Sequence, residues 1–420
     1  MKKRTILFVS MILVLLTASA FGQASKKIEL TFFETLTSPA RTEYLQQMFR
    51  KFEEKNPNIT VKLISPPYEQ AENKLTQMLN ARQPLDIIES RDATVRQFVN
   101  NGQIVSLEKY LTNWPIMNDL LPVTVESMRS IDNTAYILPW LYFVKALYVR
   151  TDILKSAGLP VPKTIDELCQ EAIKLTNPSA NKYGYVIRGK HNSWKVSQDY
   201  MCLSDVPNLD VNRFYWTKDG KFAYKTPEGK AALERYLDLY RKATPKDGVN
   251  WGFAEQINAF VSGVGVFLIQ DPDAMAMIDE QLGPDKYGIY PVPVGKTGKA
   301  YQDYAFQGLS LVSYSQNKDA AWKLMSFLLE PETNAEFCKT YGALPVHKST
   351  FANNKYFSSG RFSAWNTMLN DTKTWVTAKY PISDPRFPAW GGYQEQVMQS
   401  YLLGQISADE AINRWAKYWE

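Results

Sequence analysis

Histidine and cysteine are scarce in this chain, and their scarcity excludes several kinds of chemistry. His191 and His347 are the only histidines among 420 residues, so neither a histidine-rich metal site nor an H-E-x-x-H protease motif can form. Cys169, Cys202 and Cys338 are the only cysteines, and no C-x-x-C or other metal-ligand spacing occurs. An odd number of thiols cannot all pair, so at most one disulfide is expected. The sequence predicts no metal site.

Nucleotide-binding and nucleophile motifs are also missing. No G-x-S-x-G elbow occurs. Gly295-Lys296-Thr297 looks like the end of a phosphate loop, but Tyr290 stands where that motif needs its first glycine. Gly263-x-Gly265 precedes a predicted strand instead of following one, so it does not fit the dinucleotide fingerprint. We therefore predict no catalytic residues and no cofactor. A glycosidase stays open as an alternative, because it needs only two carboxylates.

Long hydrophobic runs are absent beyond the first two dozen residues. Three basic residues (Lys2, Lys3 and Arg4) precede an apolar run from Ile6 to Leu16 and then Ala18-Ser19-Ala20, which is the layout of a secretory signal peptide. We expect residues 1–24 to be cleaved and the mature chain to be periplasmic, without a cysteine for lipid attachment. Loss of three positive charges lowers the formal net charge from +5 to +2. Nothing in that balance favours nucleic acid or an anionic membrane.

Strands and helices alternate along the rest of the chain. Ile28–Phe33, Ile59–Ile64 and Leu85–Ile88 read as strands with helical segments between them, which predicts an α/β unit with a largely parallel sheet. Further short strands are predicted at 185–187, 264–269, 287–290 and 309–313. A length of 420 residues is too great for one ordinary core and suits two lobes.

The segment 134–168 joins these two halves. The apolar runs Tyr136–Leu138 and Ala146–Val149 read as strands separated by an aromatic stretch. Thr164 and Glu167 then form a predicted capping box that starts a helix. Ser38 before Pro39, and Ser407 before Glu410, predict two further helix starts.

This ordered string, with "LxxAGLPxPKTxDEL", resembles the extracellular solute-binding proteins of bacterial ABC sugar importers, which are the maltose-binding-protein-like, type II periplasmic binding proteins. "SQNKDAAWKLMSFLLEPE" and "YGALPVHKS" are similar to a stretch near the C-terminal third of the same family. The resemblance implies two α/β lobes, each a mixed, mostly parallel sheet flanked by helices, with a ligand cleft between them. It also implies three crossings, which we place near Tyr142, Gln307-Gly308 and Gly342–Pro345. Residues 25–142 and 309–343 would form the N-terminal lobe, and 143–308 and 344–420 the C-terminal lobe.

Aromatic side chains are abundant, with 24 Tyr, 20 Phe and 11 Trp. Flat rings cover the faces of a sugar, while Asp and Arg side chains bind its hydroxyl pairs. Most of these aromatics fit helical core positions, so the candidates are side chains in loops at strand ends or crossings. Trp390 and Tyr393 are added because FPAWGGYQEQ resembles the family's "PxWxxxxxxV" segment. The predicted ligand-binding residues are Glu34, Thr35, Thr37, Arg91, Asp92, Tyr142, Lys145, Arg188, His191, Trp194, Asp271, Asp273, Trp390 and Tyr393.

Each candidate also has an ordinary structural interpretation. Charged candidates could be solvated loop residues or helix caps, and Trp390 could pack behind Pro388. Two tryptophans common in the family are replaced here, one by Ser90 or Arg91 and one by Asp273. The replacements favour a small, densely hydroxylated ligand such as a monosaccharide, disaccharide or cyclitol, and an acidic sugar stays open because of the arginines.

The resemblance implies a monomeric receptor that closes around a carbohydrate or polyol and delivers it to the permease of an ABC transporter. Two alternatives remain at this point. One is a secreted glycoside hydrolase, and the other is a receptor that reports to a chemotaxis or sensor protein.

Overall fold

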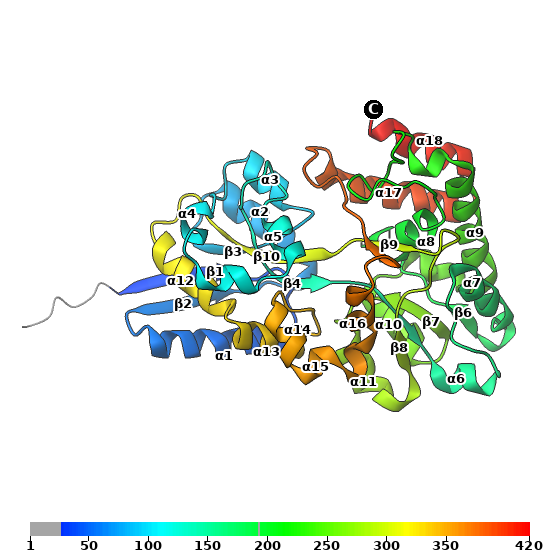
Figure 1. The fold of residues 1–420 in the computed structure, drawn as a ribbon, viewed down its shortest axis with the longest axis horizontal. Coiled ribbons are helices and arrows are strands. Elements are labelled where there is room, and N and C mark those ends of the chain that lie inside the picture. The colour runs from blue at the N-terminus through cyan, green and yellow to red at the C-terminus, as the bar shows by residue number, and fades with distance from the viewer. Residues whose placement is uncertain (1–26, 192–193) are drawn as a thin grey trace, which may run out of the picture.

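The computed structural model describes residues 27–191 and 194–420, apart from the side chains of Trp194 and Val196. The expected signal peptide, residues 1–24, lies outside the described residues. Figure 1 shows two α/β lobes side by side, joined by strands near the centre of the molecule. The two-lobed fold predicted from the sequence is therefore confirmed.

The first lobe is built on a five-stranded sheet with the order β2-β1-β3-β10-β4. Strand β1 is parallel to both β2 and β3, whereas β10 is antiparallel to β3 and β4. The strands are β1 (Ile28–Phe33), β2 (Ile59–Ile64), β3 (Ile87–Arg91), β4 (Leu138–Phe143) and β10 (Ala305–Leu311). The aromatic stretch expected between two strands is itself strand β4, because it completes the sheet edge beside β10.

The second lobe has a four-stranded sheet with the order β6-β7-β5-β8 and a separate parallel pair, β11-β9. Within the four-stranded sheet β6 and β7 run parallel, while β5 is antiparallel to both of its neighbours. The prediction of a mostly parallel sheet is therefore wrong for this lobe, because β5 enters the sheet between β7 and β8 in the opposite direction. The strands are β5 (Ala146–Val149), β6 (Tyr183–Tyr185), β7 (Gly265–Gln270), β8 (Gly288–Tyr290), β9 (Ala300–Gln302) and β11 (Trp375–Thr377).

Helices flank both sheets (Figure 1). Those associated with the first sheet are α1 (Pro39–Lys55), α2 (Tyr68–Asn80), α3 (Val95–Asn100), α4 (Glu108–Leu111), α5 (Pro122–Met128), α12 (Lys318–Leu328), α13 (Pro331–Tyr341) and α14 (Lys348–Asn353). The others are α6 (Thr151–Ser156), α7 (Ile165–Lys174), α8 (Asp199–Leu203), α9 (Pro227–Ala243), α10 (Phe253–Val261), α11 (Ala274–Leu282), α15 (Lys355–Ser358), α16 (Ser363–Asn370), α17 (Phe387–Leu402) and α18 (Ala408–Tyr418).

Three helix starts follow the predicted capping chemistry. The Ser38 side chain accepts a hydrogen bond from the backbone N–H of Arg41, with Pro39 in the first helical turn. Thr164 and Glu167 form both halves of a capping box at the start of α7. Ser407 accepts from the N–H of Glu410 at the start of α18. Each cap satisfies an otherwise unpaired backbone donor.

The chain passes between the lobes at short connections. Val144 and Lys145 join β4 to β5, and Asp303 and Tyr304 join β9 to β10. Leu344 still forms a bridge to β4, and His347 one to Leu120. We therefore propose a third crossing after His347, later than the sequence suggested, with the lobe boundaries adjusted accordingly.

All three cysteines are free and buried, and burial raises the pKa of each thiol. Among the described residues, no helix has both the length and the apolar character needed to cross a membrane. The described part of the chain also contains no group of three or more His, Cys, Asp or Glu side chains placed to hold a metal ion.

Candidate ligand site between the lobes

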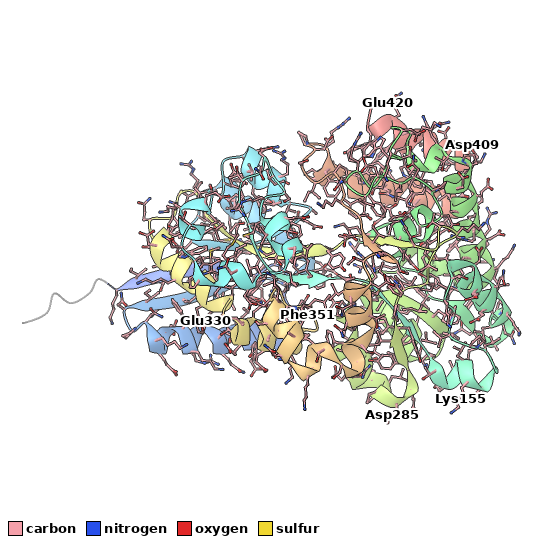
Figure 2. The ribbon with its side chains drawn as sticks, in the orientation of Figure 1. Lys155, Asp285, Glu330, Phe351, Asp409 and Glu420 are labelled. Carbon is pink, nitrogen blue, oxygen red and sulfur yellow. The ribbon has the colours of Figure 1, made fainter. Side chains whose placement is uncertain are left out.

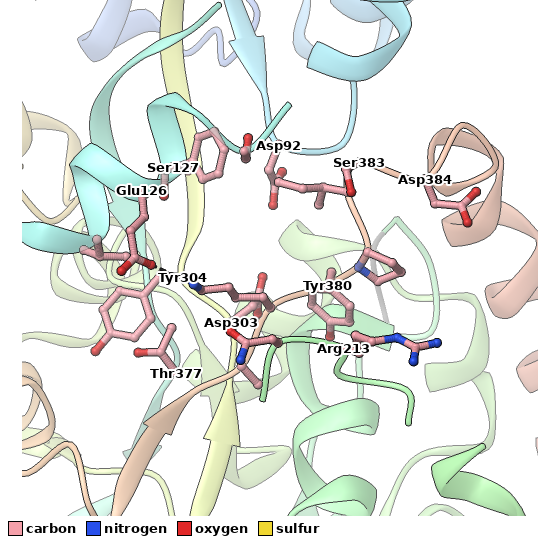
Figure 3. Close-up of a pocket in the computed structure, with 18 of the residues that line it drawn as sticks. Asp92, Glu126, Ser127, Arg213, Asp303, Tyr304, Thr377, Tyr380, Ser383 and Asp384 are labelled. Carbon is pink, nitrogen blue, oxygen red and sulfur yellow. Dashed lines mark ion pairs between the residues drawn. The ribbon is translucent and has the colours of Figure 1, made fainter. Parts of the chain in front are cut away.

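An open cleft of about 920 Å³ lies between the lobes. Its first-lobe wall comes from α5 and the turn after it, and its second-lobe wall comes mainly from residues 377–386. Figure 3 shows Asp92 and Asp303 pointing into this cleft, with Glu126 and Ser127 on one side and Tyr380 and Ser383 on the other. The cleft therefore exposes both charged and aromatic groups to a guest.

Buried ion pairs join the lobes at the floor of the cleft. Lys195, from the π-helical turn Trp194–Gln198, places Nζ 2.5 Å from Asp92 Oδ2 and 3.3 Å from Asp303 Oδ2. Lys145 Nζ lies 2.5 Å from Asp303 Oδ1. Burial works against ionisation of Asp303, but the two lysines outweigh it and hold its pKa below the usual value. These side chains, from strand ends and crossings of both lobes, form a continuous charged network.

Further charged side chains lie beside this network. Arg91, at the end of β3, has Nη1 3.4 Å from Glu72 Oε1, and its Nη2 lies 3.5 Å from Tyr68 Oη. Arg188, after β6, is buried, and its Nε donates to the carbonyl of Lys190 at 3.1 Å. We call the following set the interlobe charge cluster: Arg91, Asp92, Lys145, Arg188, Lys195, Asp271, Asp273 and Asp303.

Asp271 and Asp273 follow strand β7 and complete the cluster. The Oδ1 atom of each is buried without a hydrogen-bond partner among the described residues. Burial and the neighbouring charge of Asp271 raise the pKa of Asp273 to about 7, although Arg188 acts in the opposite direction. Burial also raises the pKa of Asp271, opposed by Lys145 and Arg188. Unmatched buried polar atoms at strand ends are the groups that a polar guest would satisfy.

The structure thus brings six of the predicted site residues together: Arg91, Asp92, Lys145, Arg188, Asp271 and Asp273. Glu34 and Thr35 lie instead in a buried network around Arg41. Arg41 reaches Glu34 Oε1 and Glu89 Oε1, each at 2.5 Å, and the Thr35 N–H donates to Glu89 Oε2 at 2.6 Å. Thr37 lines a separate groove beside Tyr68.

The remaining predicted residues are spread over both lobes. Tyr142 is buried in β4 against the rings of Tyr304 and Phe306. His191 is exposed with a backbone φ of 54°, and the side chain of Trp194 lies outside the described residues.

Trp390 is fully buried, and its indole N–H donates to Tyr215 Oη at 2.7 Å. Tyr393 stacks on Tyr418. Tyr215 in turn donates to the buried carboxylate of Asp199, so this aromatic group packs inside the second lobe.

Sequence reasoning missed Lys195, Asp303 and Tyr68. Tyr68 follows the end of β2, and Asp303 follows β9 at a crossing. The rule that ligands bind at strand ends would have found both if it had been applied to those two strands. Lys195 does not follow a predicted strand, so this rule could not have found it. Its position depends on the path of the π-helical turn Trp194–Gln198.

Two α/β lobes joined by crossing strands, with a charged cleft between them, define the class of two-lobed ligand-binding proteins. Within this class, the chain belongs to the bacterial extracellular solute-binding protein family, whose profile matches residues 38–335. The family consists of substrate-binding proteins and not of enzymes.

Several known proteins are similar over most of the chain. A binding protein of Brucella abortus (strain 2308) is 25% identical over 408 residues, covering 95% of this chain and 93% of the relative. The mannitol-binding protein of Pseudomonas aeruginosa is 24% identical, covering 70% of this chain and 71% of the relative. The solved structure of maltose-bound MalE3 from T. maritima has a TM-score of 0.78 at 22% identity, covering 93% of this chain and 98% of that one.

Proposed function

We propose that this protein is the extracytoplasmic receptor of an ABC importer and that it captures a small carbohydrate or polyol between its lobes. The observation that carries the proposal is the interlobe charge cluster. Side chains of both lobes meet in it, and Asp271 and Asp273 have buried Oδ1 atoms with no hydrogen-bond partner among the described residues. The mannitol-binding relative and the maltose-bound neighbour support a hydroxyl-rich ligand.

The chemistry of the cluster suits such a ligand. A hydroxyl group donates one hydrogen bond and accepts others, so it can serve a carboxylate and a guanidinium at once. Asp271 and Asp273 would accept from ligand hydroxyls, and Arg188 would donate to an adjacent oxygen. Hydrogen bonds to charged groups contribute about 1.5–3 kcal/mol each, and a micromolar dissociation constant needs about 8 kcal/mol. A few such contacts and some ring stacking therefore suffice.

Lobe closure would couple capture to delivery. A ligand that touches both lobes favours the closed form by the difference in its affinity for the two forms. The membrane permease would then bind the closed protein, which we propose to act as a monomer outside the inner membrane after removal of its signal peptide. The predicted residues that lie in the cluster are the ones we propose to contact ligand.

Calorimetry tests the proposal. Titration with monosaccharides, disaccharides and linear or cyclic polyols should give at least one dissociation constant in the micromolar range or below. Arg188→Met should weaken that binding about tenfold to hundredfold, because a hydrogen bond to a charged group is lost.

Arg414→Met is the matched control, since Arg414 is exposed and its ion pair among the described residues is with Glu410 on the same helix, α18. It should leave affinity unchanged. Binding no tighter than millimolar across the whole panel would overturn the proposal.

A further inference from the structure

Most cations of the interlobe charge cluster already have an anionic partner. Lys145 pairs with Asp303, Lys195 pairs with Asp92 and Asp303, and Arg91 pairs with Glu72 outside the cluster. These pairs need no guest to neutralise them. They leave three charged side chains to consider, all at strand ends of the second lobe: Arg188, Asp271 and Asp273.

Arg188 is only 7% exposed, yet it forms no ion pair with any described residue. Its Nε donates to the carbonyl of Lys190, and its guanidinium lies 5.7 Å from the ring centre of Phe253. Asp271 and Asp273 are close enough for Arg188 to lower the pKa of both, but their Oδ1 atoms lack hydrogen-bond partners among the described residues. The Arg188 guanidinium and the two carboxylates thus lie near one another, but no hydrogen bond joins them among the described residues.

The charges of this region do not balance. The Arg91–Glu72 pair cancels, and Lys145, Lys195 and Arg188 then stand against four carboxylates: Asp92, Asp271, Asp273 and Asp303. With every carboxylate ionised, one negative charge would be in excess, but the pKa of Asp273 is about 7, so a proton neutralises about half of that charge at pH 7. The remaining negative charge falls on Asp271 and Asp273, because Asp92 and Asp303 are held by lysines. Buried charge of this kind is costly unless it is paired.

A cationic group in the ligand would neutralise the remaining charge and take the place of that proton beside the unpartnered Oδ1 atoms of Asp271 and Asp273. We infer that the ligand carries one positive charge, as a sugar or polyol in which a protonated amine replaces a hydroxyl group. This inference rests on the proposed function and narrows its substrate class. The ammonium group would donate to Asp271 and Asp273, and Arg188 would donate to a neighbouring hydroxyl oxygen.

Matched ligand pairs test the inference. Calorimetry at pH 7 would compare each neutral compound with its amino counterpart and its N-acetylated form, using glucose, mannose, galactose and glucitol series. In the best-bound series the amine should bind at least tenfold tighter than both neutral forms. Asp273→Asn should reduce this preference to threefold or less, because the amine loses more affinity than the neutral compound does.

A second readout is the proton released on binding. With a pKa of about 7, Asp273 holds about half a proton at pH 7, and a bound ammonium should expel it. The binding enthalpy should then differ between phosphate and Tris buffers by about half the difference in buffer ionisation enthalpy. A neutral ligand should show no such release.

Asp409→Asn is the control with the same charge change. Asp409 lies at the outer end of the second lobe and pairs with Lys230 (Figure 2). It should keep the full amine preference. Equal or weaker binding of every amine relative to its neutral form would overturn the inference and leave the proposed function standing. Absence of binding by all compounds would overturn both.

Discussion

A single residue, Asp273, is expected to lower the free energy of unfolding because its carboxylate is buried. Its pKa is about 7 in the folded protein, against an ordinary value of 3.8. Between these values the folded state holds a proton that the unfolded chain releases. The free energy of unfolding therefore falls as pH rises from about 4 to 7. Below pH 4 both states are protonated, and the penalty disappears.

Asp273→Asn should remove this penalty. At pH 8 we expect the ligand-free variant to melt above the wild type, because the raised pKa of Asp273 makes ionisation of this carboxylate destabilise the folded state at that pH. At pH 4 the two proteins should melt together. Differential scanning calorimetry between pH 4 and 8 measures the difference. A variant that melts lower than the wild type at pH 8 would contradict the proposed burial cost.

At the scale of elements, two glycines have opposite requirements. A Cβ on Gly184 in β6 would come within 2.0 Å of the carbonyl oxygen of Ala172 on α7. A Cβ on Gly392 in α17 would meet nothing within 4 Å. Gly184 thus allows strand β6 to pack closely against α7. Gly392 has no such packing role and lowers the stability of α17.

Gly184→Ala should lower the free energy of unfolding by about 1–3 kcal/mol or more, because the sheet and α7 must separate. Gly392→Ala should raise it by about 0.5–1 kcal/mol, because alanine is the better helix former. Urea unfolding followed by circular dichroism tests both. Equal effects of the two substitutions would show that the packing of β6 on α7 tolerates a methyl group.

Helix caps and alternating apolar residues predicted the starts of helices and the bounds of some strands correctly. The bounds of β2 were predicted correctly, and the caps at Ser38 and Thr164 are present as expected. Strand β10 starts at Ala305, four residues before its predicted start, because pairing with β4 extends it. Pairing between distant segments leaves no local pattern.

The same limit applies to the candidate site. Arg91 and Asp92 were found because they follow a strand, and the topology brings them to Arg188 and Asp271. Glu34 follows a strand too, yet Arg41 draws it into a buried network. A strand-end position thus identifies candidates, and the partners of each side chain decide which of them face a cleft.

At the scale of the whole molecule, polar contacts between the described parts of the two lobes help to hold them together. Lys195 pairs with Asp92 in the buried cluster. Nearer the surface, Lys379 Nζ lies 2.7 Å from Glu126 Oε2, and Arg96 donates to the carbonyl of Ser383 at 2.5 Å. Exposed pairs contribute little, so the buried pair should contribute most to the observed arrangement of the lobes.

Lys195→Met should therefore favour an open arrangement. Removing one partner of a buried pair costs about 3–5 kcal/mol, and separation of the lobes lets water reach Asp92 again. Small-angle X-ray scattering without ligand should give a larger radius of gyration than for the wild type, and ligand affinity should fall. Lys230→Met, at a surface pair, should change neither. An unchanged radius for Lys195→Met would show that other contacts hold the lobes.

The buried state of Cys169, Cys202 and Cys338 has a practical consequence. Their thiols are buried and stay protonated at neutral pH, because burial raises the pKa of each. Maleimide reacts with accessible thiolates, so it should not label these three cysteines. One cysteine introduced at Ser383 on the cleft rim would then be the only site for a fluorescent dye. No native cysteine would have to be removed before such a label is attached.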